Sequence, residues 1–233
     1  FLFSLQNLMF LGFEEIYNLP IKGLEISWNE SLPNHNEKWG FKKIKKLHLF
    51  WPSEEKVTHV DFLAGLVSIE NLKLEGSYSS ISPDFSIDGL KFLKNLKYLR
   101  TYSLGFNKTD ILSNIKNLNY VILKEDNLTD ISGLTSSPNL EFIDFNKSKK
   151  LVDISPLNKL KNIKLIDISG TGIISLKGLE NSANLHGINI SGSPIQNLDG
   201  LLNAKNLYCV NASSCKELEN IEGIKNSIKL KEI

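Results

Sequence analysis

The sequence is poor in the residues that build reactive, cross-linked or metal-binding sites. Among its 233 residues there are only two cysteines and four histidines. Cys209 and Cys215 form no CxxC motif, and no histidine has a metal-ligand spacing to another histidine or to a cysteine. Neither a phosphate-binding glycine loop nor a nucleophile elbow is present. The sequence therefore predicts that the chain is not an enzyme and uses no cofactor and no metal.

The chain also lacks a strong charge and long apolar runs. Its net charge is +1, which gives no electrostatic reason to expect nucleic acid or an anionic membrane as a partner. Segment 41–51 combines four lysines with aromatic residues, but its apolar residues follow the repeat pattern described below, so the lysines are predicted to lie on the solvated side of a strand. No apolar run approaches the roughly 18 residues that a membrane span needs.

The beginning of the sequence gives no compartment. It lacks a methionine, and it lacks the basic flank and cleavage site of a signal peptide. The localisation therefore stays open between a surface or secreted protein and a cytoplasmic one.

What the sequence does contain is a repeat. The unit 163–184 carries apolar residues in an L-x-x-L-x-L spacing, and equivalent units run before and after it. Successive anchors stand 22 or 23 residues apart: Leu96, Leu118, Leu140, Ile163, Leu185, Leu207 and Leu230. A fixed period in the twenties predicts a solenoid, in which each repeat buries its apolar side chains against its neighbours.

Before Leu96 the repeats are longer and irregular. Anchors are predicted at Ile44 and Ile69, 25 and 27 residues before the next anchors, and at Ile21. The first strand is predicted to carry Leu5, Leu8 and Phe10, only 16 residues before its equivalents. The extra residues are expected to form helical turns at 60–66 and 86–93, whereas the 22-residue repeats are expected to cross in short 3₁₀ turns.

Three phrases carry a family resemblance: 128–134 (LTDISGL), 151–157 (LVDISPL) and 173–179 (IISLKGL). With this period the chain resembles leucine-rich-repeat proteins, and in particular their 22-residue internalin-like subclass. The resemblance implies an α/β repeat solenoid, a right-handed curved horseshoe with a parallel β-sheet on its concave face and short helices or 3₁₀ turns on its convex face. It also suggests a bacterial source.

We expect a single domain over 1–233, with irregular longer repeats at 1–95 and regular 22–23-residue repeats at 96–229. Residues 230–233 begin a further repeat and provide no polar cap for the exposed core. The sequence therefore predicts a part of a longer protein, or ends that another copy or domain covers.

One position departs from the family pattern. The turn after each strand usually carries an Asn, and none is present here. That column is read as Leu104, Asp126, Ser148, Thr171, Ser193 and Cys215. We expect shorter side chains or water to satisfy the backbone groups of the turn, with Cys215 as a small buried residue and Cys209 on a strand.

Alternation along each strand predicts three columns of outward side chains. The first contains Tyr98, Tyr120, Phe142 and Leu165, which either form an apolar binding surface or stack on one another as a stabilising ladder. In the second column, Asp144 and Asp167 are like charges on adjacent strands, which suggests either plain solvation or a use such as receiving a basic side chain or, less plausibly, a cation. The candidate partner-binding residues are Tyr98, Arg100, Tyr102, Tyr120, Ile122, Phe142, Asp144, Leu165 and Asp167.

The predicted function is protein–protein recognition through the concave sheet. Tyr and Arg, which dominate binding hot spots, are present in the outward columns. The alternatives are the substrate-targeting or regulatory portion of a larger bacterial effector or enzyme, an immunity protein that neutralises a toxin, and a purely structural repeat array. No sequence feature names the partner protein.

Overall fold

The computed structural model describes residues 2–4, 23–27, 44–51, 57–76, 81–105 and 107–232. The chain divides into two compact units, Phe1–Gly105 and Phe106–Ile233. The prediction of one domain, with a change of repeat type at residue 95, stays a prediction. The predicted anchors Leu5 and Ile21 lie outside the described residues.

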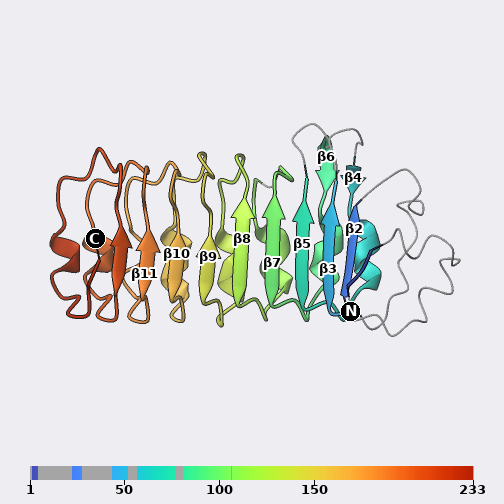
Figure 1. Cartoon of the computed structure of the whole chain (residues 1–233), viewed down its shortest axis with the longest axis horizontal. Helices are drawn as coiled ribbons and strands as arrows, with labels where there is room; N and C mark the ends of the chain where they lie inside the picture. Colours follow the sequence, from blue (N-terminus) through green and yellow to red (C-terminus); the bar gives the residue numbers. More distant parts are fainter. Residues whose placement is uncertain are drawn as a thin grey trace, which may run out of the picture. The chain divides into compact units, whose positions relative to one another are not determined.

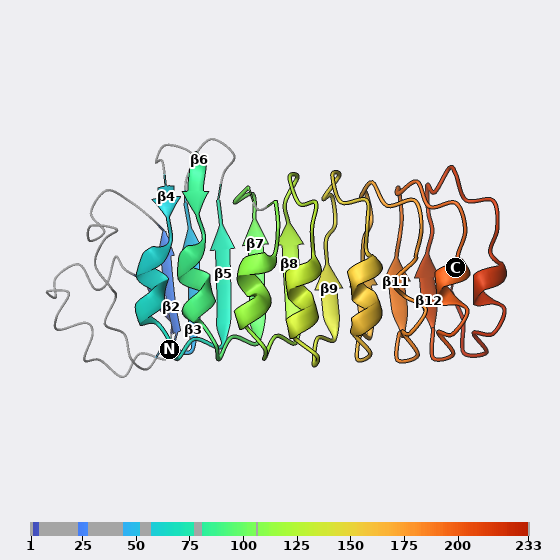
Figure 2. The same cartoon turned by 180° about the vertical axis from the view of Figure 1, so that it is seen from behind.

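The first unit contains a parallel sheet with the strand order β1-β2-β3-β5-β7. Its strands are β1 (Leu2–Ser4), β2 (Gly23–Ser27), β3 (Lys46–Phe50), β5 (Asn71–Glu75) and β7 (Tyr98–Tyr102). The 3₁₀ helices η2 (Asp61–Gly65) and η3 (Asp88–Phe92) lie on one side of this sheet (Figures 1 and 2). The other side of the sheet is left open by these turns.

Two predictions for this unit were wrong. Phe3 pairs with Leu24, 21 positions later, so the first repeat is not the 16-residue step that the apolar pattern suggested. In the described part of the longer repeats the turns at 60–66 and 86–93 are also no longer than those of the regular repeats, because η2 and η3 have five residues each, as η4, η5 and η6 do. Part of their extra length instead forms β4 (Val57–His59) and β6 (Ile81–Ser86), which pair with each other in parallel.

The second unit repeats one coil with little variation. Its parallel strands follow the chain order: β8 (Tyr120–Lys124), β9 (Phe142–Asp144), β10 (Leu165–Asp167), β11 (Gly187–Asn189) and β12 (Cys209–Asn211). Its 3₁₀ helices are η4 (Asp110–Asn114), η5 (Ser132–Ser136), η6 (Ser155–Lys159), η7 (Asp199–Leu201) and η8 (Glu222–Ile224). They lie behind the strands in Figure 1 and in front of them in Figure 2.

The core lies between the strands and the 3₁₀ turns of each unit. The predicted anchors Ile44, Ile69, Leu96 and Leu118 are each at most 1% exposed, and so are those from Leu140 to Leu207. Each fully buried Leu or Ile stabilises the fold by about 1.5–3 kcal/mol relative to an exposed one. The apolar period thus predicted the core correctly.

Short polar side chains close the turns after the strands, as predicted. The Oγ atoms of Ser148 and Ser193 donate to the carbonyls of Leu123 and Ile168 in the preceding repeat, at 3.2 and 2.8 Å. Ser193 Oγ also accepts the N–H of Thr171 at 3.1 Å. These bonds satisfy backbone groups that burial would otherwise leave without a partner.

For the repeat of β8, the sequence prediction placed the wrong residue at this turn position, one residue too late in the chain. Glu125, not Asp126, occupies it: Glu125 is 1% exposed, and its N–H donates to Ser148 Oγ at 3.4 Å. Asp126 is exposed. The repeat has one residue fewer in this turn, which the alignment of apolar positions alone did not reveal.

Asparagine amides connect the repeats in a different column from the one the family uses. Asn162, Asn184 and Asn206 precede the anchors Ile163, Leu185 and Leu207, and their side chains donate to main-chain carbonyls of the preceding repeat at 2.9–3.0 Å. The recurring Asn-Leu or Asn-Ile pair is the sequence signal for this ladder.

A column of glycines allows the 3₁₀ turns to stack closely. A Cβ atom at Gly133 would overlap the main-chain carbonyl oxygen of Thr109 in the preceding repeat. The same overlap with the preceding coil would occur at Gly89, Gly178, Gly200 and Gly223. Glycine is therefore required at these positions because any larger side chain would collide with the preceding coil, and not only because of the backbone angles.

Replacing Gly133 by Ala is expected to lower the free energy of unfolding by about 3 kcal/mol, because backbone must shift to make room. The control is Gly192→Ala, since Gly192 has φ +67° but no atom within 4 Å of an added Cβ. Its expected loss is about 1–2 kcal/mol. Urea unfolding followed by circular dichroism measures both, and equal losses would contradict the stacking argument.

Three charged residues that stand just before β3, β5 and β7 form an ion-pair triad in the first unit. Glu70 lies between Lys45 and Lys97, with Nζ to carboxylate oxygen distances of 2.6 and 2.8 Å. These hydrogen bonds and charges lower the pKa of Glu70 from 4.5 to about 2. Because the folded-state pKa lies below the unfolded one, the triad stabilises the fold fully above pH 4.5, and that stabilisation is lost as the pH falls to about 2.

Glu70→Gln is therefore expected to make the unfolding free energy less dependent on pH between pH 4.5 and 2. The Glu70 side chain is 34% exposed, so the effect should be small and should shrink further in 1 M NaCl. Urea unfolding at a series of pH values tests this. An unchanged pH dependence in the variant would show that the triad does not contribute.

Candidate functional site

The open face of the sheet is the side of the strands opposite the 3₁₀ turns, and strand pairing confirms the three predicted columns in the first unit and the first two in the second. In the first unit, Asn71 pairs with Tyr98, Lys73 with Arg100 and Glu75 with Tyr102. In the second, Tyr120, Phe142, Leu165, Gly187 and Cys209 are successive partners, and so are Ile122, Asp144, Asp167, Asn189 and Asn211. The strand alternation therefore assigned the outward residues correctly.

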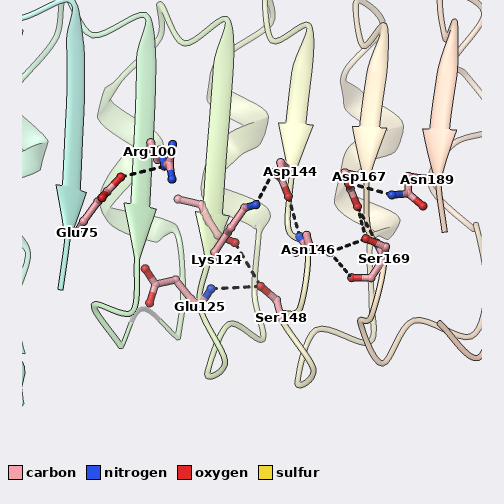
Figure 3. A network of polar contacts seen from close by, with 11 residues as sticks. Glu75, Arg100, Lys124, Glu125, Asp144, Asn146, Ser148, Asp167, Ser169 and Asn189 are labelled. Carbon is pink, nitrogen blue, oxygen red and sulfur yellow. Dashed lines mark hydrogen bonds and ion pairs between the residues drawn. The ribbon is translucent and has the colours of Figure 1, made fainter. Parts of the chain in front are cut away.

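The first unit contributes Tyr98, Arg100 and Tyr102 of the predicted binding residues. Tyr102 is 46% exposed, whereas Tyr98 and Arg100 are half-buried. The guanidinium Nε of Arg100 lies 3.2 Å from a carboxylate oxygen of Glu75 on β5 (Figure 3). The same carboxylate lies 3.5 Å from Nε2 of His48 on β3. Arg100 is thus held in place by the face itself.

The second unit carries an apolar column on its open face. Tyr120 and Leu165 are 44% and 45% exposed, and Phe142 lies half-buried between them. The rings of Tyr120 and Phe142 have centroids 6.0 Å apart and planes tilted by 32°. That contact is what the ladder interpretation predicts, but the remaining exposure also leaves apolar surface for a partner. Ile122, in the neighbouring column, is half-buried.

A ladder of Asp and Asn side chains runs beside this column. Each accepts, through Oδ1, the main-chain N–H two residues later: Asp144 from Asn146, Asp167 from Ser169, Asn189 from Ser191 and Asn211 from Ser213, all at 2.9–3.1 Å. Such Asx turns fix the chain where it leaves the strand. The recurring Asp/Asn-x-Ser/Asn spacing is a sequence signal for them that the analysis of single columns missed.

Further bonds join these turns between strands (Figure 3). Asn146 Nδ2 donates to Ser169 Oγ at 2.6 Å, and Asn189 Nδ2 donates to Asp167 Oδ2 at 3.0 Å. Ser169 Oγ in turn donates to Asp167 Oδ1 at 2.5 Å. Asp167 therefore accepts three hydrogen bonds, which fix the position of its carboxylate.

The two aspartates differ in their charge partners. Asp144 is 8% exposed, and its Oδ2 lies 3.2 Å from Nζ of Lys124 on β8, one strand away and in the third outward column. The prediction considered only lysines in the same column and overlooked this diagonal contact. Asp144 thus has its cation within the protein. Asp167 is half-buried, and none of the described residues places a cationic group within 4 Å of it.

A groove of about 490 Å³ lies over β9–β12 on the open face, within the range of about 300–1,000 Å³ typical of ligand sites. Its apolar part is formed mainly by Phe142, Leu165 and Cys209, and its polar part by Asp167, Asn189 and Glu232. Gly187 lies between Leu165 and Cys209, whose side chains lean over it: a Cβ there would stand 3.0 Å from Leu165 Cδ2 and 2.9 Å from Cys209 Sγ.

The cysteines lie on the strand and in the turn as predicted, but Cys215 is half-buried and not buried. Cys209 lies on β12, and Cys215 lies in the turn after it, where its thiol donates to the carbonyl of Ile190 at 3.0 Å. Burial raises the pKa of the Cys215 thiol, which disfavours the nucleophilic thiolate. In the described part of the chain, no group of three or more His, Cys, Asp or Glu side chains is arranged to hold a metal ion. None of the helices described there is long and apolar enough to cross a membrane.

Asp144→Ala is expected to lower the unfolding free energy by about 2 kcal/mol, because the N–H of Asn146 and the charge of Lys124 both lose their partner. Asp144→Asn should cost less than about 1 kcal/mol, since an amide oxygen can make the same turn bond, as Asn189 does. Urea unfolding measures both variants. Equal losses would show that the turn bond contributes nothing.

Comparison with known proteins bears on the fold. The sequence matches no family model and no curated protein. Among solved structures, an internalin from Listeria monocytogenes aligns with a TM-score of 0.69 at 18% identity, over 91% of this chain and 66% of that one. Internalin C2 from the same bacterium gives 0.62 at 19% identity over 76% of each chain. A chain of the mouse RP105/MD-1 complex gives 0.70 at 19% identity, over 91% of this chain and 37% of that one.

The chain spans slightly less than two thirds of the length of the first internalin. Membership of the 22-residue subclass stays a prediction, because all three likenesses fall below 20% identity. The repeated strand, buried anchor and 3₁₀ turn agree with these alignments, and together they show that the chain has the leucine-rich-repeat fold.

Proposed function

We propose that the chain is a non-enzymatic recognition module that binds a partner protein through the open face of its sheet. The observation that carries the proposal is the exposure of large apolar side chains on this face, above all Tyr120 and Leu165, at 44% and 45%. Exposed apolar surface of this kind usually marks an interaction site.

The polar surroundings support the same proposal. The carboxylates and amides beside the apolar column are engaged in turns and ion pairs, so the face is held rigid before any partner arrives. A preorganised surface loses little conformational entropy on binding. Each exposed ring or Leu that a partner covers contributes up to about 1.5–3 kcal/mol before the cost of association.

The neighbouring structures are compatible with this function without establishing it. One of them, the mouse RP105/MD-1 structure, is of a complex. The two other binding roles predicted from the sequence, a targeting portion of a larger effector or enzyme and an immunity protein, also require a protein-binding face. They differ from the recognition module in the partner and not in the surface.

A double variant, Tyr120→Ala/Leu165→Ala, tests the proposal. The matched control is Val152→Ala/Ile174→Ala, because these side chains are 59% and 52% exposed but lie outside the strands. Each protein is immobilised, incubated with lysate of the organism that encodes it, and compared by quantitative mass spectrometry after circular dichroism has verified folding. A partner should be retained by the wild type and the control and fall at least about tenfold with the face variant.

Retention of the same proteins by all three chains would overturn the proposal and favour the stacking ladder. Under that interpretation the column only stabilises the sheet. The double variant would then lower the unfolding free energy while leaving every captured protein unchanged.

A further inference from the structure

The groove over β9–β12 is lined by negative charge without a matching positive charge. Its twelve lining residues include two carboxylates, Asp167 and Glu232, and no lysine or arginine. The remaining lining side chains are apolar or neutral. A groove with this lining attracts a positively charged group and repels a negatively charged one.

The lysines nearest in the repeat pattern do not neutralise it. Lys124 pairs with Asp144 at 3.2 Å, and Lys164 pairs with Glu141 at 2.9 Å. Lys231 lies over the ring of Tyr208, with Nζ 5.0 Å from the ring centroid. The negative charge of the groove is therefore left for a ligand.

Asp167 is built to receive a cation. Its carboxylate is fixed by three hydrogen bonds from Ser169 and Asn189, yet the half-buried side chain stays partly accessible. A fixed carboxylate loses little freedom when an Arg or Lys binds to it, and a charge-assisted hydrogen bond forms at low entropic cost.

Apolar surface lies directly beside this charge. Leu165 stands two positions before Asp167 on β10, which places the two side chains roughly 6.6 Å apart along the same face. Across the sheet, Gly187 contributes no side chain, and Cys209 follows on β12. An extended polypeptide repeats its same-face side chains at the same spacing of two residues, so one basic and one apolar side chain can engage both features together.

We propose that this groove binds an extended, basic segment of the partner polypeptide, with an Arg or Lys side chain against Asp167 and an apolar side chain over Leu165, Gly187 and Cys209. The inference rests on the proposed function, because it assumes that the open face is the binding surface. It goes further in assigning the position of the contact and the chemistry of the partner.

The probe is a phage-displayed library of random 12-residue peptides selected on the whole chain. Enriched peptides should carry Arg or Lys within two residues of an apolar residue. Enrichment of acidic peptides, or of peptides without a basic residue, would overturn the inference.

The strongest peptide is then synthesised with a fluorescent label and titrated by anisotropy. Asp167→Asn removes the charge and the hydrogen bond that Oδ2 accepts from Asn189, while an amide oxygen can keep the turn bond, as Asn189 and Asn211 do in the same column. The control is Asp153→Asn, whose carboxylate makes the same turn bond to the N–H of Ser155 at 2.8 Å but lies before η6. Asp167→Asn should weaken binding about tenfold or more, and Asp153→Asn less than twofold.

Two further measurements guard against an indirect effect. Replacing the basic residue of the peptide by Gln should weaken binding by the same factor as Asp167→Asn. Combining the Gln peptide with the Asp167→Asn protein should weaken binding no further, because both changes remove the same contact. Glu232→Gln, with an exposed side chain, should weaken binding by a smaller factor of about two to three. Additive losses, or no loss with Asp167→Asn, would overturn the assignment.

Different results would reject the proposed binding face and the proposed basic segment. A natural partner lost with Tyr120→Ala/Leu165→Ala but bound equally by Asp167→Asn would leave the open face as the binding surface and reject the basic segment. Peptides that bind the chain equally well with and without both sets of changes would reject the two proposals together.

Discussion

The structure depends on the fixed offset between each repeat and the one before it. Strand pairing, the asparagine amides, the turn hydroxyls and the glycine contacts all join residues that are about one repeat apart. A coil that is too long or too short at one of these points would lose several of the contacts at once. The repeat of β8 lacks one residue in its turn and keeps the offset elsewhere, with Glu125 in the place of the usual short side chain.

This arrangement separates the residues that stabilise the fold from most of the open face, where we propose that a partner binds. The core and the coil-to-coil bonds use mainly the buried side chains and the turns, and few of them involve the outward side chains. The exceptions are Asp144 and its neighbours in the Asx ladder, which face outward and yet fix the turns. Side chains at those positions must both keep the turn in place and form part of the open face. Tyr120 and Leu165, with almost half of their surface exposed, make fewer contacts that the fold needs.

The sequence predicted the repeat, the core and the outward columns because these follow from the positions of apolar residues alone. It failed where the contact depends on geometry between columns. The ion pair of Lys124 with Asp144 is diagonal, and the groove at Gly187 arises from a missing side chain between two that lean over it. The extra strands β4 and β6 were also missed, because added length without a clear apolar period does not distinguish a strand from a helical turn.

Because the coil-to-coil contacts extend only to the adjacent repeat, the number of repeats in such a chain can change during evolution. Nearly every bond that holds a regular repeat is made to the adjacent repeat, so loss or duplication of one whole 22-residue unit by recombination would bring equivalent partners together again. The fold would survive, while the order of residues on the open face would shift by one strand. A lineage could in this way change the composition of the open face in a single genetic event.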